Sequence, residues 1–373
     1  MPPDKAGFPH YMIKEIFEQP RAVRDTIAPR IAGGQVSLEE VRIAAEEFRE
    51  LTKITIVASG TSRHAGMAGR YMIQELAGVP VDVDYASEFE YRRVTGLGEL
   101  TIVITQSGET ADTTAAQRKA KAQGSRTLAI SNVKDSTIAR EADAVICTNA
   151  GPEISIASTK AFTAQLAALY LFALYLGEMR GTLASAQMSA RIADLEAIPA
   201  KLEQVLLRDP QCEDLARDYY SKDDFLFIGR GVHYPIAMDG ALKLKEVSYI
   251  HAEGYPGGEI KHGPYALIDE KMPIVVIATR DDNDEGSLTR YEKNITSLRE
   301  IKQRGGYTIA LAIEGDTTVP AIADHVIFLP PAPELLLGML EIVPLQLLAY
   351  HIAVHRGLDV DRPRNLVKSV TTE

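Results

Sequence analysis

The 373-residue sequence has little cysteine and a deficit of positive charge. Its two cysteines, Cys147 and Cys212, are far apart and belong to no CxxC motif or Cys/His cluster. A disulfide framework and a structural zinc site are therefore not expected, and a reducing compartment suits this composition. With 40 Lys and Arg against 51 Asp and Glu, the formal net charge is −11. That balance argues against a protein that binds nucleic acid or an anionic membrane surface.

The N-terminal sequence also lacks the apolar stretch of a secretory signal, so we expect a cytoplasmic protein. Two apolar runs, residues 161–177 and 335–354, are long enough to be mistaken for membrane spans. However, Thr163 and Gln165 lie within the first run, and Glu341 interrupts the second. We therefore predict that both runs are core helices.

Short apolar runs alternate with segments of helical spacing in both halves of the chain. We expect strands at residues 54–58, 100–104, 127–130 and 144–147, and again at 225–228, 273–278, 308–312 and 325–329. Continuous apolar strands that alternate with helices predict an α/β fold with a parallel sheet covered on both faces. The opening strands are offset by 171 residues (54 to 225) and the closing glycines by 180 (177 to 357), which indicates a duplication.

The domain organisation that we predict has five parts. A helical segment, interrupted at Pro20 and at the pair Gly33 and Gly34, precedes the first α/β domain, and a charged helical connector separates the two domains. The predicted boundaries are 1–48 for the N-terminal helical segment, 49–181 for the first domain, 182–218 for the connector, 219–360 for the second domain and 361–373 for a C-terminal tail.

Two hydroxyl-rich loops of the first domain are candidates for binding an anion. TQSGET, residues 105–110, follows a predicted strand and opens a helix, where hydroxyls and free backbone N–H groups favour a phosphate. It lacks the lysine of a nucleoside-triphosphate P-loop, and simple helix capping is the alternative. SGTSRH, residues 59–64, follows another strand and places Thr61 and Ser62 at the same kind of edge. Together the loops favour a phosphorylated small molecule.

The second domain supplies ionisable groups. Lys243 and Glu246 are three residues apart on a predicted helix and share a face, although a surface ion pair worth about 0.3–0.5 kcal/mol is the alternative. The segment HAEGYPGGEIKHGP, residues 251–264, is a glycine-rich loop that contains His251 and His262. Such a loop either contacts a ligand or is a solvent-exposed turn.

For two further lysines, the local sequence pattern by itself does not indicate a functional role. STKAF, residues 158–162, is typical of a helix cap followed by a lysine, Lys160, whose ammonium group reaches the surface. The polar tail DVDRPRNLVKSVTTE carries Lys368, and lysines in such tails are usually solvated.

Taken together, these segments resemble the isomerase half of the glutamine:fructose-6-phosphate amidotransferases over essentially the whole chain. The segments that carry the resemblance are SGTS, TQSGETADT, ASTKAF, GALKLKE with its HAE, GEIKHGP and the tail DVDRPRNLVKSVT. The resemblance implies two tandem sugar-isomerase (SIS) domains, each a flavodoxin-like αβα sandwich with a parallel sheet. It also implies a homodimer and chemistry that needs no metal or cofactor.

The resemblance further implies a hexose phosphate substrate and roles for individual residues. The phosphate would be held by Ser62, Thr105, Gln106, Ser107 and Thr110, and the sugar hydroxyls by the backbone of Ile156 and by Ser158.

Four more residues would carry out the reaction. Glu246 would move a proton between C1 and C2, and Lys243 would stabilise negative charge on oxygen. His262 of the partner subunit would open the sugar ring. Lys368 would bind the open-chain ketose as a Schiff base or as a charge partner. The implied activity is that of a glutamine–fructose-6-phosphate transaminase (isomerizing), in which ketose–aldose isomerisation of fructose 6-phosphate leads to glucosamine 6-phosphate.

The sequence departs from the family pattern in three ways. Thr105 stands where serine is usual, and Ser59 where cysteine is common. The glutaminase domain that would supply ammonia is not present, so we expect either a part cut from a longer protein or a stand-alone relative. Two other functions stay open: an amino-sugar-phosphate deaminase or fructosamine deglycase, and a non-catalytic sugar-phosphate sensor.

Overall fold

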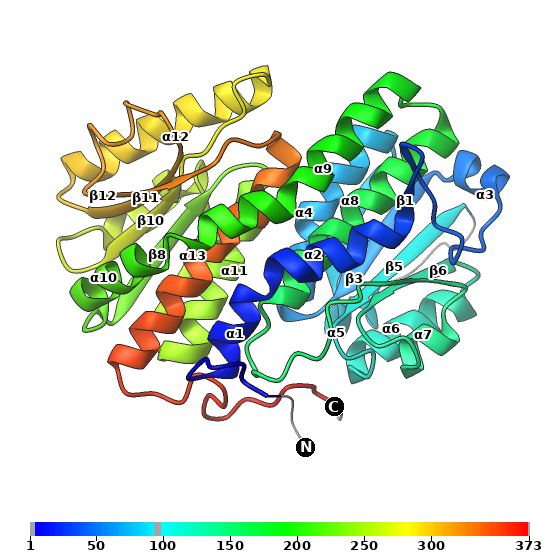
Figure 1. Ribbon diagram of the computed structural model, residues 1–373, viewed down its shortest axis with the longest axis horizontal. Coiled ribbons are helices and arrows are strands. Elements are labelled where there is room, and N and C mark those ends of the chain that lie inside the picture. Colours follow the sequence, from blue (N-terminus) through cyan, green and yellow to red (C-terminus); the bar gives the residue numbers. More distant parts are fainter. Residues whose placement is uncertain (1–3, 93–97, 372–373) are drawn as a thin grey trace. The chain divides into compact units, whose positions relative to one another are not determined.

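The structure is a computed structural model that describes residues 4–92 and 98–371. The chain divides into two compact units, each built on one five-stranded sheet (Figure 1). We call residues 18–153, 160–199 and 367–373 the N-lobe, and residues 1–17, 154–159 and 200–366 the C-lobe. The described end of the tail, residues 367–371, thus belongs to the N-lobe, and the short segment 154–159 belongs to the C-lobe.

The N-lobe sheet is entirely parallel, with the strand order β4-β3-β5-β6-β7. Its strands are β3 (Lys53–Ala58), β4 (Val81–Tyr85), β5 (Glu99–Thr105), β6 (Arg126–Ser131) and β7 (Ala144–Cys147). Numbered along the chain, this order is 2-1-3-4-5, which is the flavodoxin-like order. The central strands are buried on both faces, which explains why they appear in the sequence as unbroken apolar runs.

Helices cover both faces of the N-lobe sheet. One face carries α4 (Gly60–Ala77) and α8 (Lys160–Arg180), and the other carries α5 (Ala86–Phe89), α6 (Ala111–Ala122) and α7 (Thr137–Glu141) (Figure 1). The α4 helix lies so close to the sheet that a Cβ on Gly66 would come within 2.7 Å of the Ile56 side chain. On the opposite face, Val57, Phe89 and Val103 belong to one apolar cluster. The result is a three-layer αβα sandwich.

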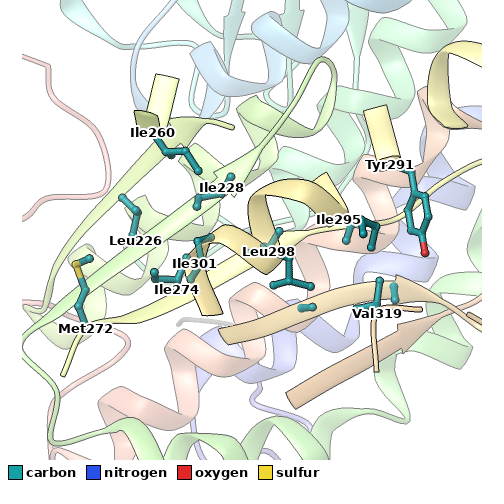
Figure 2. Close-up of a cluster of buried hydrophobic side chains, with 14 residues drawn as sticks. Leu226, Ile228, Ile260, Met272, Ile274, Tyr291, Ile295, Leu298, Ile301 and Val319 are labelled. Atoms are coloured by element: carbon teal, nitrogen blue, oxygen red, sulfur yellow. The ribbon is translucent and has the colours of Figure 1, made fainter. Parts of the chain in front are cut away.

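The C-lobe sheet repeats the same topology. Its strands are β8 (Asp224–Gly229), β9 (His251–Pro256), β10 (Pro273–Ile277), β11 (Tyr307–Ile313) and β12 (His325–Leu329), all parallel in the order β12-β11-β10-β8-β9. Read from the other edge, this is again 2-1-3-4-5. The α12 helix (Glu285–Gln303) covers one face, while α11 (His233–Ser248) and α13 (Glu334–His355) cover the other (Figure 1). Figure 2 shows the apolar core between α12 and the sheet, where Leu298 and Ile301 pack against strand residues such as Ile274.

The predicted fold class is confirmed, and all eight predicted strands are present. The strand of each five-stranded sheet that the prediction missed, β4 or β9, is the second strand of its sheet and lies at an edge. The expectation that residues 251–264 form a loop is wrong, because their first half is β9. Gly254 has a structural reason there, since a Cβ would lie 2.5 Å from the Met238 backbone of α11. After β9 come two short helical turns, η2 (Glu259–His262) and η3 (Pro264–Leu267).

The N-terminal segment is only partly helical. It consists of α1 (Tyr11–Phe17), α2 (Gln19–Ile27), η1 (Ala28–Arg30), a hairpin of β1 (Ile31–Ala32) and β2 (Gln35–Val36), and α3 (Ala45–Glu50). Pro20 lies in the first turn of α2, where proline is tolerated. Gly33 and Gly34 have φ angles of 61° and 75° and form the hairpin turn. Between the two sheets in sequence lie α9 (Ser185–Leu206) and α10 (Asp209–Tyr219).

The two long apolar helices are core elements, as the sequence predicts. In the described residues, α8 and α13 are the two helices long and apolar enough to cross a membrane. Their apolar windows are 83% and 100% buried inside the protein, which is the environment of a core helix.

Candidate functional site

Both hydroxyl-rich loops lie at the topological switch point of the N-lobe sheet. The β3 and β5 strands are neighbours, and the chain leaves them toward opposite edges, to β4 and to β6. Ala58 and Ile104 are paired at the carboxyl ends of these strands, so the loops that follow start side by side. Ligands of open parallel sheets bind at this position.

The TQSGET loop is held by hydrogen bonds among its own hydroxyls and N–H groups. Thr105 is buried, and its Oγ1 accepts the Gly108 N–H at 3.1 Å and lies 3.3 Å from the Thr110 Oγ1. Ser107 Oγ accepts the Glu109 N–H at 3.2 Å. Thr110 is the residue that precedes α6, and Gln106 and Ser107 are half-buried. The loop thus places four polar side chains at the N-terminus of a 12-residue helix.

The SGTS loop adds Ser62 from the start of α4. Ser62 is half-buried, and its Oγ accepts a hydrogen bond of 2.9 Å from Gln165 Nε2 of α8. Sequence reasoning noted Gln165 only as a polar interruption in an apolar helix. In the structure this side chain orients a predicted substrate-binding hydroxyl.

The C-terminal tail is attached to the N-lobe at two points. Lys368 Nζ lies 2.6 Å from Glu153 Oε2, and Val370 O accepts the N–H of Ala111, the first residue of α6, at 3.0 Å. The Lys368 side chain is only 25% exposed, so the interpretation of a solvated tail lysine is wrong. Glu153 was missed by sequence reasoning, which had only an isolated acidic residue ahead of an apolar helix as a signal.

The expectation for Lys160 is also wrong. Its side chain is 1% exposed and pairs with Glu18 Oε2 at 2.6 Å, so its ammonium group does not reach the surface. Buried ammonium groups require such a partner, because the desolvation of an unpaired charge is costly.

In the C-lobe, Lys243 and Glu246 form a largely buried ion pair on α11. The Lys243 side chain is fully buried, and its Nζ lies 2.5 Å from Glu246 Oε2, while the Glu246 side chain is 22% exposed. The surface-pair interpretation is therefore wrong. The arrangement leaves a carboxylate with access to solvent beside an ammonium without it, which suits a base that works next to a fixed positive charge.

The segment 154–159, which contains Ile156 and Ser158, is held by backbone hydrogen bonds within the C-lobe. The Ile154 N–H donates to Glu15 Oε1 of α1 at 2.5 Å, and the Ile156 N–H donates to the Asp361 carbonyl at 3.1 Å. The N–H of Ile156 is thus occupied, so its carbonyl is the backbone group that could accept a sugar hydroxyl. Ser158 is half-buried.

His262 ends η2 and is exposed. Its neighbours fasten this segment to α12, because Lys261 Nζ lies 2.7 Å from Glu300 Oε1 and the Tyr265 hydroxyl donates to Glu300 Oε2. These two hydrogen bonds, that from Lys261 foremost, hold the pKa of Glu300 below its usual value.

The corresponding switch point of the C-lobe is filled by the protein itself. His233, at the start of α11, lies between two buried carboxylates of α13: its Nε2 is 2.7 Å from Glu334 Oε1 and its Nδ1 is 2.8 Å from Glu341 Oε1. Thr279, just after β10, also donates to Glu341, and Arg290 of α12 pairs with Glu334. Acidic and basic side chains of the protein itself therefore pair with one another at this position.

No metal site accompanies these groups in the part of the chain that the structure describes. There, no cluster of three or more His, Cys, Asp or Glu side chains is arranged to hold a metal ion.

Comparison with known proteins agrees with this fold and with the duplication. The SIS domain family matches twice, at residues 47–175 and 218–356. A solved structure, the C-terminal domain of glucosamine-fructose-6-phosphate aminotransferase from Francisella tularensis, superposes with a TM-score of 0.90 at 41% identity, over 96% of this chain and 100% of that one. The chain is a tandem SIS-domain protein.

The curated relatives narrow the family further. Proteins named glutamine–fructose-6-phosphate aminotransferase [isomerizing] from Caldanaerobacter subterraneus and Thermus thermophilus are 48% and 47% identical over 99% of this chain. The chain spans 60% of the length of these relatives. It belongs to the family of the C-terminal domains of these aminotransferases, and the resemblance inferred from the motifs is confirmed. Glucosamine-6-phosphate deaminase from Thermotoga maritima, at 19% identity and a TM-score of 0.70, shares the fold.

Proposed function

We propose that this chain binds fructose 6-phosphate and isomerises it as part of glucosamine 6-phosphate synthesis. The observation that carries the proposal is the α11 pair, in which a fully buried Lys243 ammonium lies 2.5 Å from the partly exposed Glu246 carboxylate. Burying a lysine is costly, and a surface pair on the same helix would stabilise the fold without that cost. The names of the relatives point to the same substrate.

Phosphate binding is proposed for the N-lobe switch point. Ser62, together with Thr105, Gln106, Ser107 and Thr110, would donate hydrogen bonds to the phosphate oxygens, and the N-terminus of α6 would add its positive end. The binding energy of the phosphate would position carbon atoms that carry no charge of their own. Ile156, through its carbonyl, and Ser158 would bind the sugar hydroxyls.

Isomerisation would proceed by a proton transfer between neighbouring carbons. Glu246 would remove a proton from C1 of the open-chain ketose, which gives an enediolate whose negative oxygen faces the Lys243 ammonium, and would return the proton to C2 while the hydroxyl proton of O1 passes to O2. A single carboxylate can serve both carbons because they are adjacent. Lys368 would bind the ketose at its carbonyl, as a Schiff base or as a charge partner.

The proposal includes an assembly that the comparisons leave open. His262 of the partner subunit would open the sugar ring, which places the exposed end of η2 at the interface of a homodimer. We assign residues 49–181 and 219–360 to the two SIS domains, 182–218 to the connector and 361–373 to the tail. In the whole protein, a glutaminase domain would supply ammonia, and we expect a cytoplasmic location.

The test is incubation of the chain with fructose 6-phosphate in deuterated water, with and without ammonium, followed by mass spectrometry and NMR of the sugar. Deuterium at C1 or C2, and glucosamine 6-phosphate when ammonium is present, would support the proposal. Binding of fructose 6-phosphate by calorimetry without deuterium exchange would indicate a sensor. Ammonia release from glucosamine 6-phosphate that far exceeds synthesis would indicate a deaminase. Absence of both binding and exchange would exclude the proposed function.

A further inference from the structure

The buried carboxylate of Glu153 makes two contacts that join the tail to the body of the N-lobe. Its Oε2 lies 2.6 Å from Lys368 Nζ, and its Oε1 accepts the N–H of Ala161, in the first turn of α8, at 3.1 Å. The carboxylate is fully buried, whereas the lysine is partly exposed. Glu153 and Lys368 are 215 positions apart in the sequence.

The second attachment of the tail places Lys368 beside the TQSGET loop. The Val370 carbonyl accepts a hydrogen bond from the N–H of Ala111, the residue that follows Thr110 at the start of α6. Two residues of extended chain span at most about 7 Å, so the backbone of Lys368 lies close to the proposed phosphate site. The Glu153 carboxylate then fixes the direction of the long side chain.

Capping of α8 alone does not require a buried charge at position 153. A neutral Ser, Thr or Asn accepts a helix N–H equally well, and a buried ion pair carries a large desolvation cost. Lys160, the first residue of α8, pairs with Glu18 at the N-cap of α2 at 2.6 Å, and Arg21 of α2 pairs with the same Glu18 at 3.0 Å. The N-terminus of α8 itself stabilises an anionic Glu153.

We propose that Glu153 is the positioning residue of Lys368: it holds the amine in place as its counter-ion and accepts the proton that the ammonium must lose before it adds to a ketose carbonyl. This inference rests on the proposed function and selects the Schiff base from the two roles considered for Lys368.

The proposed step is balanced without any further reactant. The Lys368 ammonium transfers a proton to the Glu153 carboxylate, and the neutral amine forms a C–N bond at C2 while the carbonyl electron pair moves to oxygen. That oxygen takes up the proton held by Glu153 and then one from nitrogen, and it leaves as water. The ammonium and ketone have become an iminium ion and water, with the same charge at nitrogen. Glu153 therefore faces a cation before and after the reaction, and a neutral amine only in between.

The experiment traps the imine in the whole chain with fructose 6-phosphate and cyanoborohydride, and mass spectrometry measures the adduct at Lys368 as a function of pH. Glu153→Gln keeps an acceptor for the Ala161 N–H but removes the charge. We expect the plateau rate of trapping to fall at least tenfold and its pH midpoint to move down by about one unit, because an ammonium without its counter-ion loses a proton more readily. Glu153→Asp should give a smaller shift in the same direction, and Lys368→Arg should give no adduct.

The outcomes separate the inference from the function on which it rests. A plateau that falls with an unchanged midpoint in both Glu153 variants would mean that Glu153 only tethers the tail, and this would overturn the proposal. Wild-type adduct levels in Glu153→Gln would also overturn it. A wild-type chain that binds and isomerises the sugar but yields no adduct would overturn the inference and leave the proposed function intact. Thermal unfolding of each variant shows that it is folded, and Glu153→Asp carries the test if Glu153→Gln does not fold.

Discussion

The hydroxyl group of Ser136 occupies the space that a Cβ on Gly108 would need. Gly108 lies in the TQSGET loop with φ of 71°, and its carbonyl accepts the Ile138 N–H of α7 at 3.1 Å. Ser136 is in turn the N-cap of α7, where its Oγ accepts the Ala139 N–H. The loop proposed to bind phosphate is therefore packed directly against the start of the next helix.

Replacement of Gly108 by Ala should destabilise the N-lobe through backbone strain and a steric clash together. Gly124 is the matched control, since its φ is 86° but no atom of the residues that the structure describes lies within 4 Å of the added Cβ. We expect Gly124→Ala to cost about 1 kcal/mol, from the left-handed backbone alone, and Gly108→Ala to cost about 3 kcal/mol or more. Urea unfolding measures both. Equal costs would show that the packing against Ser136 is readily relieved.

Thr105→Val should weaken the binding of fructose 6-phosphate. Valine has nearly the same shape, but it removes the Oγ1 that accepts the Gly108 N–H and contacts Thr110. We expect the Kd to rise about tenfold, which corresponds to about 1.4 kcal/mol for a lost hydrogen bond in the site. Calorimetry gives the value. Thr289→Val on the exposed face of α12, where the hydroxyl donates to the Glu285 carbonyl of its own helix, is the control and should leave the Kd unchanged.

Glu246→Gln should abolish isomerisation while binding is retained. The amide still fills the space beside Lys243 but cannot accept a proton from carbon, so kcat should fall by about 100-fold or more. Glu213→Gln on α10 is the matched control, because Glu213 forms a helical ion pair of the same 2.5 Å length with Arg217 on the surface. That change should leave kcat unchanged, and it should alter the free energy of unfolding by no more than about 0.5 kcal/mol. Deuterium exchange into the sugar measures turnover, and undiminished exchange in Glu246→Gln would refute the role of this base.

Glu341→Gln should destabilise the C-lobe without changing the Kd for fructose 6-phosphate. Glu341 is buried against His233 and Thr279, and loss of one partner from a buried network costs about 3 kcal/mol. Glu314→Gln is the surface control, because Glu314 pairs with Arg208 at 2.7 Å on the solvent-exposed surface. Thermal unfolding should separate the two variants clearly. A large change in the Kd for fructose 6-phosphate in folded Glu341→Gln would contradict the assignment of phosphate binding to the N-lobe.

The lowered pKa of Glu300 predicts an acid-sensitive attachment of the segment that carries His262. A carboxyl group whose pKa is lower in the folded than in the unfolded protein adds stability that is complete above the unfolded value, 4.5, and is lost as the pH falls through the folded value. The free energy of unfolding of the wild-type chain should therefore fall more steeply between about pH 5 and pH 3 than that of Glu300→Gln. Glu292→Gln, an exposed glutamate of the same helix, should retain the wild-type slope. Identical slopes in all three chains would show that the Lys261 and Tyr265 bonds add no stability.

The central strands were predictable because strands buried on both faces must be apolar throughout. The edge strands were not: β4 alternates apolar and acidic residues, and β9 contains Gly254 where α11 crosses closely. The switch-point position of the loops followed from parallel topology. The burial of Lys160 and Lys243, by contrast, depends on tertiary packing that no local pattern records.

The partners of the site residues were the least predictable part. Glu153 meets Lys368 across 215 positions, and Gln165 meets Ser62 across 103. A single side chain in an apolar helix or a polar tail has no local signal for such a contact. The family motifs predicted the site residues, whereas the structure shows the side chains that contact two of them, Lys368 and Ser62.

The carboxylates of Glu334 and Glu341 have a consequence for how the two copies of the duplicated fold respond to substrate. In the C-lobe these carboxylates belong to the chain and already pair with His233 and Arg290, so this network forms when the protein folds. The N-lobe loops that we propose to bind phosphate would meet their anion only when the substrate binds. Binding of the sugar phosphate should therefore rigidify the N-lobe and leave the C-lobe unchanged.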